Sequence, residues 1–144
     1  MKYQELEEKR NNLKKHALLS DIGWNNGTLQ TEMGRILSKD GQLYFYTLVP
    51  DHQVKEAKKT FDQPINELEE TTISKEEFKQ LKKVLETEIL TKQYESQVLE
   101  DAGVIIQINY QKKQLTVSNN IELIEKMNDL LNNLNPIPSK KQSN

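Results

Sequence analysis

The dipeptide Asp40-Gly41 interrupts a stretch of alternating apolar and polar residues that runs from residue 29 to residue 49. Asp-Gly tolerates the positive φ angles of a tight turn, so it is among the strongest short-range signals for a β-hairpin. A two-residue loop at this dipeptide would place Arg35 opposite Tyr46. Because the segment after the turn is apolar or aromatic on both faces, we expect its strand to be central or covered on both sides.

A second alternating pattern runs from residue 104 to residue 118, with its most apolar residues on one face. A short loop centred on Lys112-Lys113 would pair Tyr110 with Leu115 and keep that apolar face continuous. The pattern therefore predicts a second hairpin, and the two hairpins together predict an antiparallel sheet.

Two amphipathic helices are expected, one after each hairpin. Ser74 and Glu77 have the spacing of a capping box, which predicts a helix over residues 74–90. Asn119 has a similar position before residues 120–134, where apolar side chains recur with helical spacing. Both helices have one apolar side, and we expect that side to pack on the sheet.

Residues 3–19 are rich in good helix formers and predict an N-terminal helix, whose thin apolar stripe is broken by Arg10. Turn-forming residues surround Trp24, so we expect it in a loop after this helix. Residues 136–144 contain two prolines and polar residues and predict a disordered tail. The sequence thus predicts one α+β domain over residues 1–135.

The charge pattern excludes several classes of function. The chain has 20 basic and 22 acidic residues, interleaved to a net charge of −2, which gives no positive surface for nucleic acid. It has no cysteine and no apolar run of the ~20 residues that a membrane span needs. As written we expect a cytoplasmic protein; the alternative is an exported protein whose signal peptide has been removed.

No catalytic constellation is visible in the sequence. The two histidines, His16 and His52, stand far apart in the chain, and each is interpreted as a solvated polar residue. The acidic clusters are explained by helix propensity and capping, and no spacing matches a metal site or a phosphate loop. We therefore predict no catalytic residue, no cofactor and no metal.

Three aromatic residues are candidates for contact with a partner. Trp24 lies among glycines and asparagines, where it can either anchor a partner or plug the end of the core. Tyr44 and Tyr46 belong to an aromatic run on the second strand of the first hairpin. Such a run is also usual on a central strand, so the packing interpretation is kept beside the binding one.

By elimination, the sequence favours a non-catalytic protein-binding module, such as an inhibitor, an immunity-type protein or an adaptor. One alternative is a small ligand-binding domain or enzyme with its site between sheet and helices. The other is a structural subunit of a larger assembly, with self-association through the N-terminal helix.

Overall fold

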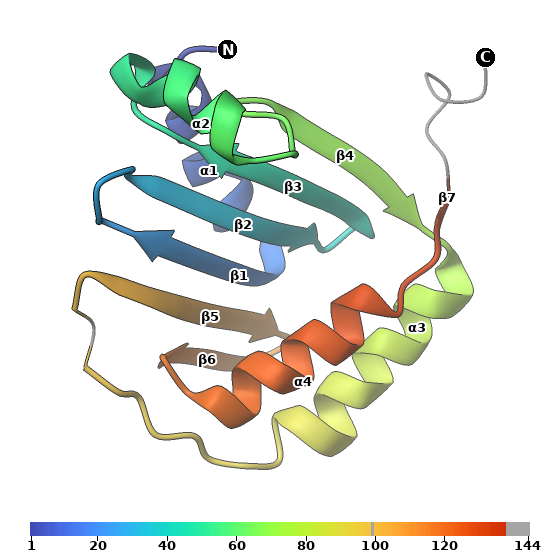
Figure 1. Cartoon of the computed structure of the whole chain (residues 1–144). Coiled ribbons are helices and arrows are strands. Elements are labelled where there is room, and N and C mark those ends of the chain that lie inside the picture. Colours follow the sequence, from blue (N-terminus) through green and yellow to red (C-terminus); the bar gives the residue numbers. More distant parts are fainter. Residues whose placement is uncertain (99, 138–144) are drawn as a thin grey trace.

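The computed structural model describes residues 1–98 and 100–137, which form one antiparallel sheet with helices on both faces (Figure 1). The sheet has seven strands in the order β6-β5-β1-β2-β3-β4-β7. The strands are β1 (Ala17–Asn25), β2 (Thr31–Ser38), β3 (Gln42–Leu48), β4 (Leu68–Ile73), β5 (Ala102–Tyr110), β6 (Lys113–Ser118) and β7 (Pro136–Ile137). The helices are α1 (Tyr3–Lys15), α2 (Val54–Thr60), α3 (Lys75–Val84) and α4 (Ile121–Asn132), with a 3-10 turn η1 (Asp51–Gln53) and a π-helical turn η2 (Leu85–Ile89).

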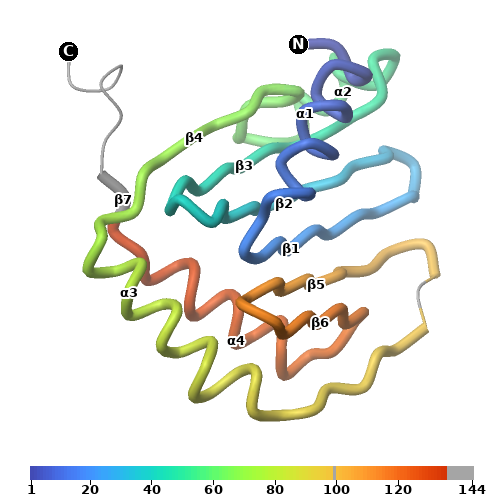
Figure 2. The backbone as a smooth tube through the Cα atoms, turned by 180° about the vertical axis from the view of Figure 1, so that it is seen from behind, coloured from blue at the N-terminus to red at the C-terminus, as the bar shows by residue number. Residues whose placement is uncertain are grey.

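The two faces of the sheet are covered unequally. The antiparallel helices α3 and α4 cover part of one face, and α1 crosses the other face (Figures 1 and 2). The predicted α+β class, with an antiparallel sheet packed against helices, is confirmed.

The strand β1 lies where sequence reasoning predicted the end of a helix and a loop. The N-terminal helix ends at Lys15 instead of residue 19, and β1 follows almost at once. This strand lies in the middle of the sheet between β5 and β2, and it carries Trp24, which is therefore not in a loop. Asp21 is tolerated because Arg35 of the neighbouring strand pairs with its carboxylate, and Gly23 is paired in the sheet with Met33 and Val104.

The register of the first hairpin is also corrected. Arg35 lies opposite Phe45, not Tyr46, because the loop has three residues instead of two. The N–H of Gly41 donates to the carbonyl of Ser38 at 3.2 Å, and Gly41 then takes a φ of +87°. This is the usual geometry of a three-residue hairpin loop, with a turn followed by a left-handed residue. The shift by one residue moves Tyr46 to the opposite face from Arg35.

The second hairpin is present with a different register. Leu115 pairs with Ile108 instead of Tyr110, and Tyr110 pairs with Lys113. The loop is tighter than expected, with Gln111 at a φ of +54°. Because this register differs from the expected one by two residues, the apolar side chains stay on the predicted face.

The helix starts follow local capping chemistry. The Ser74 hydroxyl accepts the N–H of Glu77 at 3.1 Å, as the capping signature predicts. At α4 the cap is Asn120, whose side chain accepts the N–H of Leu123 at 2.9 Å. Asn119, which we expected to be the cap, instead accepts the N–H of Val104 at 2.8 Å and ties the helix start to β5.

The C-terminal segment contributes to the sheet before the described residues end. Pro136 pairs with Ile73 and Ile137 with Thr72, so the last described residues extend the sheet beyond β4. The remainder of the predicted tail, residues 138–144, lies outside the described residues.

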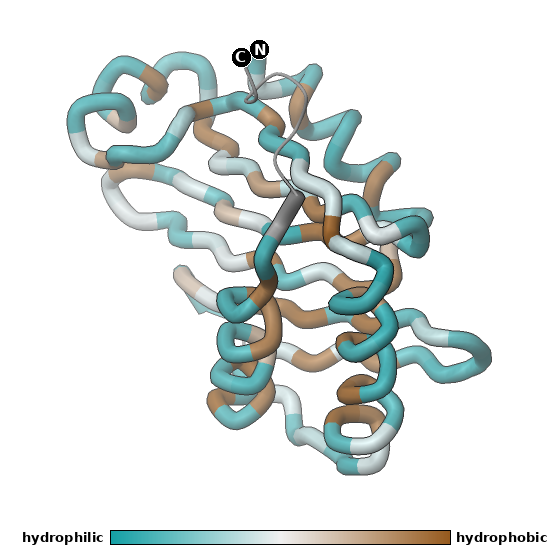
Figure 3. Tube along the Cα trace, turned by 90° about the vertical axis from the view of Figure 1, so that its right-hand side faces the viewer, coloured by the Kyte–Doolittle hydropathy of each residue, from teal (hydrophilic) through white to brown (hydrophobic). Residues whose placement is uncertain are grey.

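Three groups of buried side chains hold the layers together. The largest lies between the sheet and α3, η2 and α4, and Figure 3 shows the alternation of apolar and polar residues along these helices. A second lies under α1, where Leu6 is fully buried against Ile36, and a third surrounds Ala57 of α2. The main group comprises Leu18, Leu19, Leu37, Leu43, Ile73, Leu81, Leu85, Ile89, Ile106, Ile108, Val117, Leu123, Met127 and Leu131.

Candidate functional site

A row of side chains crosses the face of the sheet that α3 and α4 partly cover. Asp21 pairs with Arg35, Arg35 with Phe45, and Phe45 with Glu69, so neighbouring positions on β1, β2, β3 and β4 are joined. Directly opposed residues of antiparallel strands project from the same face. The register therefore places a carboxylate, a guanidinium, an aromatic ring and a second carboxylate side by side.

The first two members of this row form an ion pair on the floor of the sheet. One Arg35 nitrogen (Nη2) donates to Asp21 and also to Asn128 Oδ1 at 2.6 Å, and the other (Nη1) donates to Asn132 Oδ1 at 3.0 Å. The side chains of Arg35 and Asp21 are only 17% and 9% exposed. The two asparagines come from α4, so the helix layer fixes the guanidinium in place. Its charge is matched by Asp21.

The row forms part of a cavity that α3 and α4 leave uncovered. The cavity has a volume of about 450 Å³. On one side it is bounded by Ile124 and Asn128 of α4, and on the other by the segment Gln63-Pro64 before β4. Next to this row, Gly23 pairs with Val104 and has no side chain, so it leaves space in the cavity. The lining also includes Met33, Thr47, Glu67 and Val104.

The rim of this cavity carries negative charge beside apolar surface. Glu67 and Glu69 are exposed, and neither forms an ion pair with any residue in the part of the chain that the structure describes. Phe45 is half-buried, and Met33 is 39% exposed, unusual for a large apolar side chain. Since Asp21 already neutralises Arg35, the charge left over at the cavity is negative. Such a surface favours a cationic group with an apolar stem.

The opposite face carries a similar cluster in a different setting. Arg10 of α1 donates from one nitrogen to both carboxylate oxygens of Glu32, at 2.5 and 2.6 Å, and the Tyr46 hydroxyl donates to the same carboxylate at 2.6 Å. Burial disfavours the charge on Arg10, but the hydrogen bond and charge of Glu32 raise its pKa overall. Burial, followed by the charge of Glu32, raises the pKa of Tyr46 well above its ordinary value.

The side chains of all three predicted partner-binding aromatics lie on this α1 face, although Tyr46, next to Phe45 on β3, also borders the cavity. Tyr46 is 4% exposed and belongs to the core under α1. Tyr44 is half-buried, and burial, then the charges of Glu70 and Asp40, raises its pKa. Trp24 is half-buried beside α1, where it lines a hollow of about 250 Å³. Trp24 and Tyr44 thus keep some accessible surface, whereas the Tyr46 ring has almost none.

The two histidines lie apart from the cavity. His16 and His52 are both exposed, and neither lines the cavity. Within residues 1–98 and 100–137, no three side chains of the metal-binding types come close enough to hold an ion. The same residues include no helix with the length and apolar character needed to cross a membrane.

The chain matches no known family model and none of the curated proteins with which it was compared. Its site must therefore be argued from its own side chains. Sequence reasoning placed Arg35 opposite Tyr46 and explained the acidic clusters, which include Glu67 and Glu69, by helix propensity and capping, so it did not place Arg35 and Glu69 in one row. The available signal was the alternation of Glu67 and Glu69, which places two such residues on the same side of an extended backbone, although β4 itself begins at Leu68.

Proposed function

We propose that this chain is a non-catalytic protein-binding module, of the inhibitor, immunity-type or adaptor kind, and that the cavity over Phe45 contacts a basic segment of its partner. The observation that carries the proposal is that Glu67 and Glu69, which lie at the cavity beside exposed Met33, form no ion pair with any of the described residues. A lysine or arginine side chain could lay its stem over Phe45 and direct its charge to the two carboxylates.

The surrounding structure supports this use of the cavity. Arg35 is held by Asp21, Asn128 and Asn132, so it does not compete for the carboxylates on the rim. The cavity floor is built on strands, which hold side chains more precisely than loops do. Complementary charge at an exposed rim chiefly speeds association and selects the partner, as a binding module requires.

Affinity capture from the cells that produce the protein tests this proposal. The baits are the wild type, the double variant Glu67→Gln with Glu69→Gln, and Glu70→Gln as a matched control on the other face of β4. We expect a stoichiometric partner with wild type and control, and affinity reduced about tenfold in the double variant. Raising the salt concentration should weaken wild-type binding and leave the double variant less affected.

Two outcomes would contradict the proposal at different levels. If no bait captured a stoichiometric partner, the binding-module function would be wrong. If a partner were captured equally by all three baits, the cavity would be wrong as its contact surface. A Trp24→Ala bait tells the faces apart, because loss of the partner in that variant alone would move the contact to the α1 face.

A second candidate function is the binding of a small organic cation. The cavity volume of about 450 Å³ falls in the usual range for small-molecule sites, roughly 300 to 1,000 Å³. The same aromatic ring and carboxylates would hold an ammonium group. Mass spectrometry of the protein purified from its own cells distinguishes this function, since a bound small molecule, released on denaturation, would replace the protein partner.

A further inference from the structure

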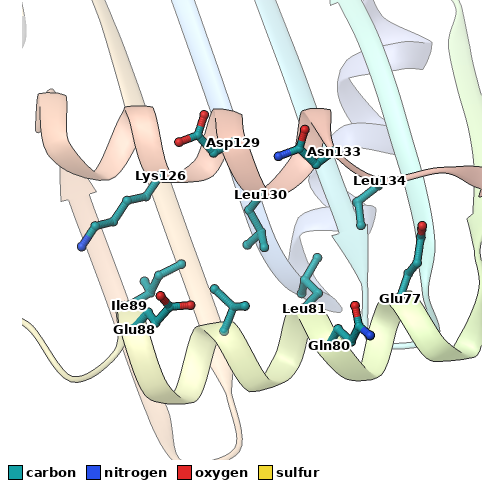
Figure 4. A pocket seen from close by; sticks show the side chains of 11 residues that line it. Glu77, Gln80, Leu81, Glu88, Ile89, Lys126, Asp129, Leu130, Asn133 and Leu134 are labelled. Carbon is teal, nitrogen blue, oxygen red and sulfur yellow. The ribbon is translucent and has the colours of Figure 1, made fainter.

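A second hollow lies between α3 and α4, on the other side of α4 from the Phe45 cavity. It has a volume of about 380 Å³, and its lining is drawn in Figure 4. Leu81 and Ile89 lie deep in it and are almost fully buried. Three further apolar side chains, Val84, Leu130 and Leu134, are only half-buried and line its walls. The hollow is therefore an apolar groove between two antiparallel helices, which we call the α3/α4 groove.

The π-helical turn η2 shapes one end of this groove. The N–H of Leu90 donates to the carbonyl of Leu85 at 2.8 Å, one residue further than in an α-helix. A π-turn changes the direction of the side chains that follow it, and such turns often occur at functional sites. Here both Glu88 and Ile89, which lie within the turn, line the groove.

The rims of the groove are negatively charged. Figure 4 shows Glu77 and Glu88 on α3 and Asp129 on the outer edge of α4, with Lys126 as the one ammonium group among the labelled residues. Lys126 lies 3.2 Å from a carboxylate oxygen of Glu122 outside the groove, which offsets its charge. Glu88 and Asp129 are exposed and have no ion pair among the described residues.

We propose that the α3/α4 groove binds an amphipathic helix of a protein partner, with leucine-like residues on its apolar side and lysine or arginine on both flanks. This inference rests on the proposed function as a binding module and assigns it a second contact surface. A helix laid between two antiparallel helices places residues spaced by three and four into such a groove. Its basic flanks would then meet Glu88 on one rim and Asp129 on the other.

The probe for this proposal is a synthetic peptide of about 14 residues, which forms about four helical turns. It has leucines at helical spacing and lysines on both flanks, and a matched peptide carries glutamates in place of the lysines. Binding is followed by the methyl NMR signals of the isolated protein. We expect saturable shifts of the Val84, Leu130 and Leu134 signals with the lysine peptide only. Leu130→Glu should weaken this binding at least about tenfold.

Leu130→Glu changes a half-buried side chain, so a second variant that alters only exposed charges tests the proposal without disturbing the core. Glu88→Lys with Asp129→Lys changes only exposed side chains, and it should abolish binding of the lysine peptide and create binding of the glutamate peptide. Glu125→Gln, on an exposed part of α4 outside the groove lining, is the matched control and should bind as the wild type does. Equal binding of both peptides, or shifts in the Phe45 cavity instead, would overturn the proposal.

Other occupants give different results in the same samples. If the free wild type were a dimer that Leu130→Glu converts to a monomer, the groove would be an interface between copies. If deleting residues 138–144 shifted the groove methyl signals before peptide was added, that segment would be the occupant. Either result overturns the helix proposal. A negative peptide result leaves partner capture through Glu67 and Glu69 intact, so the two proposals fail separately.

Discussion

Two arginine–carboxylate pairs lie on opposite faces of the same central strands, and they have different roles. Arg35 and Asp21 are neighbours within the sheet, and α4 adds two amide groups to the guanidinium. Arg10 instead belongs to α1 and reaches Glu32 across the layer boundary. All four side chains have low exposure, 17% and 9% in the first pair and 15% and 21% in the second. The two pairs are therefore buried to a similar degree, but Arg35–Asp21 forms the floor of a cavity, whereas Arg10–Glu32 attaches α1 to the sheet.

The covering of each pair explains this difference. On the α1 face, Tyr46 lies across Gly34 and its hydroxyl completes the Glu32 cluster. The hollow beside Arg10 and Glu32 is therefore smaller, about 250 Å³ against about 450 Å³ for the cavity on the other face. On the other face, α4 contacts Arg35 through Asn128 and Asn132, and Phe45 and Met33 remain accessible. The larger cavity thus lies where the helix layer stops short of the charged pair.

The largest expected effect comes from adding one methyl group under Tyr46. A Cβ at Gly34 would stand 2.3 Å from ring atoms of Tyr46, far inside contact distance. Gly34→Ala should lower the free energy of unfolding by about 3 kcal/mol, because the ring must move and separate from Glu32. Urea unfolding measures the loss.

The matched control for this prediction is Gly23→Ala on the cavity floor. There the nearest atom, Val104 Cγ2, would be 3.4 Å from the added Cβ, which is ordinary contact. We expect a change below about 1 kcal/mol. Equal losses at Gly34 and Gly23 would contradict the contrast between a filled face and an open one.

The next largest effect concerns the Arg35–Asp21 pair. Asp21→Leu alone leaves the guanidinium with two amides and no opposite charge, and it should cost about 2 to 3 kcal/mol in urea unfolding. Adding Arg35→Met should recover most of that loss, because replacing both partners of a buried pair is often close to neutral. If the double variant were as unstable as the single one, the pair would not act as a unit.

The local elements of this fold are readable from the sequence, and the contacts between them are less so. Ser74 and Asp40-Gly41 mark a helix start and a hairpin through chemistry confined to a few residues. The strand β1 was missed because Asp21 and Gly23 resemble turn residues. Asp21 is stable in a central strand only because Arg35, distant in sequence, lies opposite it.

The candidate site was out of reach for a related reason. A difference of one residue in the first hairpin register determines whether Arg35 lies opposite Tyr46 or Phe45, and therefore which aromatic ring shares its face. The loop length that sets this register depends on Gly41 taking a left-handed conformation after a turn, which the dipeptide alone does not specify. The acidic rim then follows from the pairing of Phe45 with Glu69.

The smallest expected effect on the free energy of unfolding comes from removing the Tyr46 hydroxyl while keeping its buried ring. Tyr46→Phe keeps the ring over Gly34 and removes the hydroxyl that donates to Glu32 at 2.6 Å. Because Arg10 still satisfies that carboxylate, the free energy of unfolding at neutral pH should fall by only about 1 kcal/mol. Tyr44→Phe, at a less buried tyrosine on the same face, is the control.

The pH dependence of stability in Tyr46→Phe is a stronger test than the size of its loss at neutral pH. The folded state raises the pKa of Tyr46 above the unfolded value of 10.0, mainly by burial and then by the charge of Glu32. The stabilisation is therefore complete below pH 10, and above it the unfolded chain loses its proton first. Wild-type stability should then fall by up to about 1.4 kcal/mol per pH unit more than that of Tyr46→Phe, so the two curves meet near about pH 11. Parallel curves would mean that water reaches the hydroxyl in the native state, and that α1 covers its face less tightly than the Arg10 contact indicates.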